Sequence, residues 1–225
     1  MPVYSAGVPF PSPPWSLRAH AWVSVFALTE APRPDRPEGI YAAAFVDYRE
    51  GGVLAYHELL VVRLLRDGTV PRVRVTDIWV DSPESLAGGR SLWAIPKQQA
   101  LLPLQERRVG PVARTSFRGL DRLDHPKNRL DHPKNRLDHP EHRREVAHGE
   151  FTSVPGAALV RMPLRGSTSQ VREDGTTVVA PLAGSGRVVP CFGRWTFDAD
   201  GPLGFLSGRR PLLSAHLLDV RLLFG

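Results

Sequence analysis

The sequence predicts a mostly β fold, a β-rich α+β protein built as a barrel or a strongly curved antiparallel sheet with a few short helices. The chain holds 22 prolines and 20 glycines, which suits short strands joined by turns better than long helices. Its apolar stretches are rich in Val, Phe, Trp and Tyr, which are enriched in strands. With 225 residues, of which 42% are hydrophobic, the chain can bury a sizeable core, so we expect a single domain over residues 1–225.

The expected strands follow a proline-rich, extended lead-in of sixteen residues. Apolar, β-branched or aromatic stretches bounded by turn clusters mark each of them. They cover residues 19–28, 40–48, 56–65, 70–80, 98–105, 112–117, 145–151, 158–163, 176–182, 187–197 and 212–224. No regular alternation of strands with long helices interrupts the series, so a parallel, doubly wound sheet is not expected.

One short helix is expected to start at Ser82. A serine followed by Pro83 and Glu84 supplies a capping hydroxyl, a proline at the first helical position and an acid in the first turn. Gly88 and Gly89 are expected to end this helix after about two turns, because glycine is a poor helix former.

A seven-residue repeat occupies residues 120–144. The unit Arg-Leu-Asp-His-Pro-Lys-Asn begins at Arg122, repeats at Arg129 and recurs with changes from Arg136. Leucine returns every seventh residue, as in a coiled coil, but a proline in each unit would break a helix. Four of the eight histidines lie here, yet a metal site needs convergent ligands with supporting hydrogen bonds. We expect a disordered loop insertion and no metal site.

The charge balance, +6 with a pI near 10.1, raises the question of nucleic-acid binding. Residues 122–144 hold seven basic and four acidic residues, so +3 of the +6 comes from this one segment. The rest of the chain is mildly basic with scattered acids. We therefore expect a solvated surface and no nucleic-acid partner.

The chain has the composition of a cytoplasmic protein. Cys191 is the single cysteine, so no intramolecular disulfide can form, which favours a reducing compartment. The N-terminus lacks the basic and apolar regions of a signal peptide. The apolar run over residues 21–28 is far too short to span a bilayer, so no membrane partner is expected.

Lysine is scarce in this chain. Of 29 lysines and arginines, the lysines are Lys97, Lys127 and Lys134, and the last two belong to the repeat. Arginine stays protonated and cannot form an imine, whereas a buried lysine can lose its proton and can react with a carbonyl. Lys97 is therefore a candidate for lysine-specific chemistry, with chance survival of one lysine as the alternative.

Three short motifs carry a family resemblance. They are Gly-Gly-Arg-Ser-Leu-Trp-Ala-Ile-Pro-Lys at 88–97, Ala-Tyr-His-Glu-Leu-Leu at 55–60 and Leu-Arg-Ala-His at 17–20. Their order and spacing resemble the acetoacetate decarboxylase superfamily, of which this chain would be a divergent member. In that family a Gly-Arg turn leads to a Pro-Lys pair with the reactive lysine, Tyr-x-Glu supplies a carboxylate, and an early arginine lies near the substrate. The resemblance runs from Arg18 to the closing segment 211–225 and omits the repeat.

The resemblance implies a cone-like β-barrel and a Schiff-base lyase that acts on a small keto acid. Lys97 would attack the ketone and form an iminium that accepts the electrons of a breaking carbon–carbon bond. Glu58 would move protons as the acid/base residue. No cofactor is implied, because the iminium is itself the electron sink. Members of the family are oligomeric, so a homo-oligomer is expected.

Four further residues are expected to bind the substrate. Arg18 and Arg90 could hold a carboxylate through paired hydrogen bonds, and Tyr56 and Trp93 could form pocket walls. Each has a simpler reading. Arg90 could only brace its turn through backbone carbonyls, which we favour, and Tyr56 could be an ordinary core residue. Glu58 could likewise be an exposed acid at a strand edge, because carboxylates are seldom fully buried.

Two positions depart from the family pattern. Gln98 stands where decarboxylases have a second lysine, and ungapped spacing puts Ala43 where they have a second glutamate. These departures argue against acetoacetate itself as the substrate. Two reactions of a small keto acid are expected as alternatives, decarboxylation and aldol-type condensation with dehydration, because both begin with the same iminium. The main alternative from another class is a non-catalytic small-molecule-binding barrel that has lost turnover.

Overall fold

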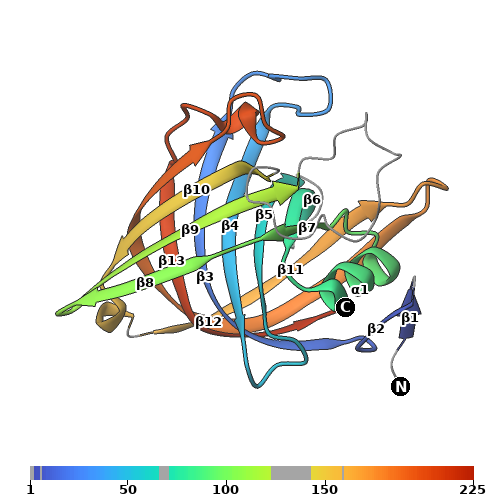
Figure 1. The fold of residues 1–225 in the computed structure, drawn as a ribbon, viewed down its shortest axis with the longest axis horizontal. Helices are drawn as coiled ribbons and strands as arrows, with labels where there is room; N and C mark the ends of the chain where they lie inside the picture. Colours follow the sequence, from blue (N-terminus) through green and yellow to red (C-terminus); the bar gives the residue numbers. More distant parts are fainter. Residues whose placement is uncertain (1–2, 6, 66–70, 123–142, 159) are drawn as a thin grey trace.

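The fold, seen in a computed structural model, is built almost entirely of strands (Figure 1). Residues 3–5, 7–65, 71–122, 143–158 and 160–225 are described. The strands are β1 (Val3–Ser5), β2 (Val8–Phe10), β3 (Trp15–Leu28), β4 (Gly39–Arg49), β5 (Tyr56–Leu65), β6 (Arg72–Val80), β7 (Gln98–Leu101), β8 (Leu104–Val109), β9 (Val112–Arg122), β10 (Arg143–Ser153), β11 (Arg161–Val171), β12 (Thr177–Phe197) and β13 (Leu213–Phe224). The helices are α1 (Pro83–Trp93) and two short 3₁₀ turns, Pro155–Ala157 and Gly204–Leu206.

Eleven strands form one sheet in the order β10-β12-β13-β3-β4-β5-β6-β7-β9-β8. The remaining strand, β11, pairs with β12 and with β6, and β9 also pairs with β10. The pairing is antiparallel except at β6–β7 and β6–β11. Figure 1 shows how strongly the sheet curves. The prediction of a mostly β fold with a strongly curved antiparallel sheet and few short helices is confirmed.

Several predicted strand boundaries are wrong. The segment 98–105 contains two strands, β7 and β8, and in the segment 158–163 the strand β11 begins only at Arg161, after the 3₁₀ turn Pro155–Ala157. The segments 176–182 and 187–197 are one strand, β12, of 21 residues. The residues between them include Gly184, where a Cβ would lie 2.1 Å from the Arg221 carbonyl oxygen. Gly184 is there because β13 approaches closely, a role that glycine also has within strands.

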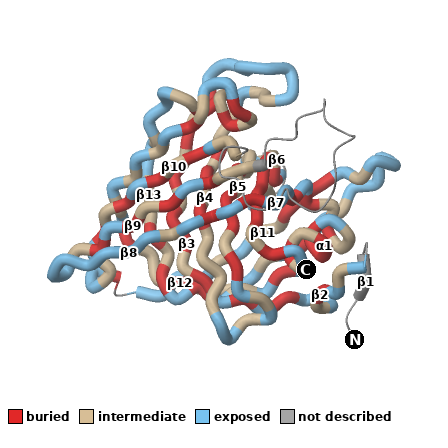
Figure 2. Tube along the Cα trace, in the orientation of Figure 1, coloured by how far each residue is buried: buried red, intermediate tan, exposed pale blue. Residues whose placement is uncertain are grey.

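Strand β5 divides its side chains between two cores. Leu59 and Val61 point into the larger one, whereas Leu60 and Val62 pack against the smaller one, as the two-residue period of a strand requires. Figure 2 shows the resulting alternation of buried and less buried positions along the strands. A bulge in the β5–β6 pairing at Val61 and Val62 shifts the register by one residue.

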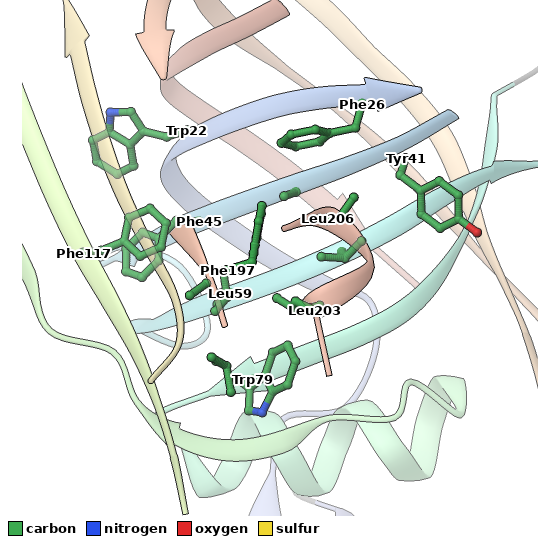
Figure 3. Close-up of a cluster of buried hydrophobic side chains, with 14 of the residues drawn as sticks. Trp22, Phe26, Tyr41, Phe45, Leu59, Trp79, Phe117, Phe197, Leu203 and Leu206 are labelled. Atoms are coloured by element: carbon green, nitrogen blue, oxygen red, sulfur yellow. The ribbon is translucent and has the colours of Figure 1, made fainter. Parts of the chain in front are cut away.

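The larger core is aromatic. Figure 3 shows its side chains converging between the strands and the turn that carries Leu203 and Leu206. Phe45 stacks on Phe117 with ring centroids 4.1 Å apart and the ring planes 17° from parallel. The other labelled members are Trp22, Phe26, Tyr41, Leu59, Trp79 and Phe197.

The smaller core lies between α1 and the sheet. Trp93, at the end of α1, contacts Trp15 edge-to-face with ring centroids 4.7 Å apart, and it contacts Phe224 at 4.6 Å. Ile78 and Val80 add aliphatic side chains from β6. Trp15 and Phe224 lie on the neighbouring strands β3 and β13, so both strands pack against the C-terminal end of α1.

The prediction that Gly88 and Gly89 end the helix is wrong. Helix α1 continues through both glycines to Trp93, and its predicted cap is present, since the Ser82 hydroxyl accepts the Ser85 N–H at 3.0 Å. A Cβ on Gly88 would lie 2.5 Å from the Trp15 ring. Tertiary packing thus overrides the low helix propensity of glycine.

The histidine-rich insertion falls mostly outside the described residues. Residues 120–122 and 143–144 are described, and they belong to β9 and β10, which pair as far as Arg122 and Arg143. The expectation for residues 123–142 stays a prediction. In the described parts of the chain, no helix is long and apolar enough to cross a membrane.

A buried histidine couples the larger core to pH. His216 on β13 is 2% exposed, stacks on Trp22 at 4.6 Å between ring centroids, and has Nδ1 3.0 Å from the Ser153 hydroxyl. Burial lowers the pKa of His216 to about 4, and the positive charges of His20, Arg49 and Arg108 act in the same direction. The folded protein therefore keeps this imidazole neutral at pH values where the unfolded chain protonates it.

We predict that the free energy of unfolding falls as pH drops from about 6.5 to about 4. Above pH 6.5, the usual pKa of histidine in the unfolded chain, His216 is neutral in both states and does not lower the stability. Between about pH 6.5 and 4 the unfolded chain binds a proton that the folded protein does not, so the free energy of unfolding falls by about 3 kcal/mol in total. Below the folded pKa of about 4 both states are protonated and the loss no longer grows. Urea denaturation at a series of pH values measures the slope. His216→Gln, which cannot titrate, should flatten it, and an unchanged slope in this variant would contradict the assignment.

Candidate functional site

The site is centred on a lysine and a glutamate that are buried in the same pocket. Lys97 is 4% exposed and Glu58 is 5% exposed. The Lys97 Nζ lies 2.8 Å from the Glu58 Oε2. Two charges out of water need a partner and further hydrogen bonds, or the burial is costly. Both conditions are met here, because the Lys97 Nζ also donates to the Ser85 hydroxyl at 2.8 Å.

The turn after α1 fixes the backbone of Lys97. Ala94 ends the helix in the left-handed region at φ 53°, and the Ile95 N–H donates to the Gly89 carbonyl at 3.1 Å. The Arg90 Nε donates to the carbonyl of Lys97 at 2.7 Å. A non-glycine residue with a left-handed backbone is strained, so this turn depends on the contacts around it.

A missing side chain makes room for the lysine. A Cβ on Gly89 would lie 2.6 Å from the Lys97 Cε and 2.7 Å from its Cδ. The aliphatic part of Lys97 therefore runs directly across the helix at Gly89. This contact explains why the helix tolerates glycine at a buried position.

Two tyrosines cover the carboxylate of Glu58. The Tyr56 hydroxyl donates to the Glu58 Oε2 at 3.3 Å, and the Tyr48 hydroxyl donates to the Oε1 at 3.4 Å. Burial raises the pKa of both tyrosines well above the usual value, and the charge of Glu58 raises it further. Both hydroxyls thus keep their protons at neutral pH and act as donors. The rings stack with centroids 4.5 Å apart.

The pocket around this pair is mostly apolar and has a volume of about 200 Å³. Its polar side chains are Lys97, Glu58, Tyr48, Tyr56 and Thr168. Its apolar walls are Trp15, Leu17, Leu60, Val62, Val73, Val75, Ile78, Trp93, Ile95, Leu182, Leu222 and Phe224. Such a cavity, apolar with a few convergent polar groups, is typical of a small-molecule site.

An open, polar groove borders the pocket at the two tyrosines, and Asp47, Arg49 and Glu84 are among its lining residues. In it the His57 Nδ1 lies 2.8 Å from the Asp81 Oδ2, and this hydrogen bond is the main reason that the pKa of His57 is raised. Tyr48 and Tyr56 line both hollows. The tyrosine pair therefore separates a charged groove from the apolar pocket.

The structure brings four of the six sequence-predicted site residues together. Lys97, Glu58, Tyr56 and Trp93 all line the pocket. A buried lysine beside a carboxylate and tyrosine hydroxyls can form an imine once its amine has passed a proton to the carboxylate.

The two arginines stand apart from the pocket. Leu17 and Trp15 face it, so the strand alternation turns Arg18 to the other side, where it is exposed and close to Gly51. Arg90 is also exposed and braces the turn, which was the simpler reading. Neither arginine is among the described residues that line the pocket.

The two positions that depart from the family pattern also lie outside the pocket. Ala43 on β4 is fully buried in the larger core, facing away from Lys97. Gln98, the first residue of β7, is exposed. Among the described lining residues Glu58 is therefore the one carboxylate.

Sequence reasoning missed Ser85 and Tyr48. A helical spacing of four places Ser85, Gly89 and Trp93 on one face of α1, and each touches Lys97 or lines the pocket. That signal was hidden because the glycines were expected to end the helix. Tyr48 carried no local signal, since it approaches Glu58 only through the pairing of β4 with β5.

Among the described residues, no group of three or more His, Cys, Asp or Glu side chains could hold a metal ion.

Comparison with solved structures identifies the fold. The enduracididine biosynthesis enzyme MppR complexed with pyruvate is 16% identical with a TM-score of 0.61, over 96% of this chain and 89% of that one. A structure from structural studies of acetoacetate decarboxylase is 15% identical with a TM-score of 0.55, over 96% and 88%. The acetoacetate decarboxylase of Legionella pneumophila subsp. pneumophila str. Philadelphia 1 is 13% identical with a TM-score of 0.55, over 95% and 86%. At these identities the likeness shows the fold alone.

The sequence gives the family. No curated protein matches the chain, but residues 29–152, more than half of it, match the acetoacetate decarboxylase (ADC) family. The matched segment includes Tyr56, Glu58, Arg90, Trp93 and Lys97, whereas Arg18 precedes it. The chain therefore belongs to the acetoacetate decarboxylase family.

Proposed function

We propose that this protein is a Schiff-base lyase that acts on a small keto acid through an iminium on Lys97. The observation that supports this most is the buried lysine, 2.8 Å from a buried carboxylate inside an apolar pocket. Membership of the family adds support. The reaction is either decarboxylation or an aldol-type condensation with dehydration, because both begin with the same iminium.

Lys97 is the proposed nucleophile. Its amine must first lose a proton, and Glu58 is close enough to accept it directly. The neutral Nζ then forms a bond to the ketone carbon, and the ketone oxygen leaves as water after gaining two protons. The resulting iminium nitrogen can accept the electron pair of the bond that breaks next.

Glu58 is the proposed acid/base residue, and the two tyrosines orient it. Because their hydroxyls stay protonated, they donate to the carboxylate and leave it able to exchange a proton with the Lys97 Nζ. Ser85 holds the Nζ from the helix side. Arg90 is proposed as a positioning residue, because it bonds the Lys97 carbonyl and not the pocket.

The iminium is tested by borohydride trapping. We predict that a keto acid such as pyruvate or acetoacetate leaves a stable reduced adduct on Lys97, because hydride from the borohydride adds to the iminium carbon. Intact mass and peptide mapping locate the adduct. Lys127, Lys134 and the N-terminal amine serve as internal controls, since the chain has no other primary amines.

Lys97→Arg is the matched variant, because it keeps a positive charge but cannot form an imine. It should leave no adduct. A failure of the wild-type protein to form any adduct at several pH values, with ligand still bound in rapid exchange, would favour the non-catalytic binding barrel.

Removing the carboxylate should slow imine formation. Glu58→Gln keeps the shape of the side chain but cannot accept the ammonium proton, so we expect adduct formation to slow by about 10²- to 10⁴-fold. Quenched time courses of the trapping reaction measure the rate. Glu150→Gln, at an exposed carboxylate on β10, is the control and should match the wild type. An equal rate in the two variants would remove Glu58 from the mechanism.

Filling the space at Gly89 should displace the lysine without unfolding the helix. Gly89→Ala adds a Cβ within 3 Å of the Lys97 side chain, so we expect at least about a tenfold loss in trapping rate, while alanine favours the helix itself. Circular dichroism melting checks the fold. Gly156→Ala, where a Cβ would meet nothing within 4 Å, is the control. Normal trapping in G89A would contradict the packing argument.

A further inference from the structure

Four of the five polar side chains of the pocket are gathered at one end. Lys97, Glu58 and the two tyrosine hydroxyls contact one another. The cavity then continues along β5 past Leu60 and Val62. The four residue steps from Glu58 to Val62 cover about 13 Å of strand, so the pocket lining includes residues well away from the reacting atoms.

The pocket wall formed by β5 and β6 is aliphatic beyond the polar end, whereas the aromatic wall residues Trp15, Trp93 and Phe224 come from β3, α1 and β13. Val73, Val75 and Ile78 of β6 face the same space as Leu60 and Val62 of β5. Thr168 is the remaining polar side chain, and it pairs with Val73 at the other end of this row. A ligand that grows away from Lys97 meets these aliphatic groups before it reaches the threonine.

The volume sets the size of the ligand. A cavity of about 150 Å³ holds benzene, with six non-hydrogen atoms. By that measure 200 Å³ holds about eight. The part of pyruvate that remains in an iminium has five non-hydrogen atoms, so pyruvate would leave the aliphatic part of the pocket unfilled.

We infer that the substrate is a keto acid with an apolar tail of about four carbons, lying along β5. This inference rests on the proposed iminium at Lys97 and adds the substrate class. The tail contacts Leu60, Val62, Val75 and Ile78, and its binding comes from the apolar surface that leaves water. The iminium of 2-oxohexanoate, with eight non-hydrogen atoms retained, matches the volume.

A chain-length series tests the inference. Borohydride trapping on Lys97 is measured for pyruvate, 2-oxobutyrate, 2-oxopentanoate, 2-oxohexanoate and 2-oxooctanoate. The half-saturating concentration should fall about fourfold for each added methylene, the equivalent of about 0.8 kcal/mol. It should stop falling near 2-oxohexanoate because the pocket is then full.

Two variants locate the tail. Val62→Phe, at a half-buried position in the pocket wall, should raise the half-saturating concentration of 2-oxohexanoate at least tenfold more than that of pyruvate. Leu64→Phe, on the same strand but outside the pocket lining, is the control. If V62F does not fold, Leu60→Ala enlarges the same wall and should move the optimum towards 2-oxooctanoate.

The outcomes separate the two proposals. Adducts on Lys97 whose half-saturating concentration is flat across the series, or lowest for pyruvate, would overturn the apolar tail and leave the iminium intact. A total absence of adducts, with every acid in the series, would overturn the proposed function and this inference with it.

Discussion

A lysine that must be buried determines the local architecture of this protein. An ammonium group inside an apolar pocket is tolerated only with a counter-charge and with hydrogen bonds for its remaining protons. Glu58, Ser85 and Tyr56 satisfy the Lys97 Nζ from three directions. Tyr56 and Glu58 belong to β5, whereas Ser85 belongs to α1. The helix must therefore pack against the sheet before all three partners can reach the lysine.

The contact at Gly89 shows how the helix meets this requirement. The lysine follows α1 by four residues and folds back across it, which is possible because Gly89 has no side chain. The same helix uses Gly88 to admit the edge of Trp15. Both glycines weaken the helix locally, and the surrounding packing compensates. A sequence optimised for helix stability alone would lose the pocket, a common conflict between stability and function.

Local patterns predicted much of the fold and part of the site. The sequence predicted most of the strands and the helix cap at Ser82, because these features depend on nearby residues. It also predicted Glu58 and Lys97 as candidate site residues, because a family motif contains each of them. The continuation of α1 through Gly88-Gly89 was not visible, because Trp15 and Lys97 supply its reason from elsewhere in the chain. Tyr48 joins the site only through the pairing of β4 with β5. Arg18 lies outside the pocket lining, because a motif gives a position in the sequence but not the face of the strand.

Strand β12 contributes side chains to both cores. Near its start, Ala180 packs in the smaller core with Leu182, and towards its end Phe197 packs in the larger core with Trp195. A continuous strand of 21 residues cannot lose its partners on one side without disturbing those on the other. The pocket is therefore part of the same cooperative unit as the aromatic core, and it should have no separate melting transition. Substitutions deep in the aromatic core would then change how long the pocket survives heating, even though they touch none of its residues.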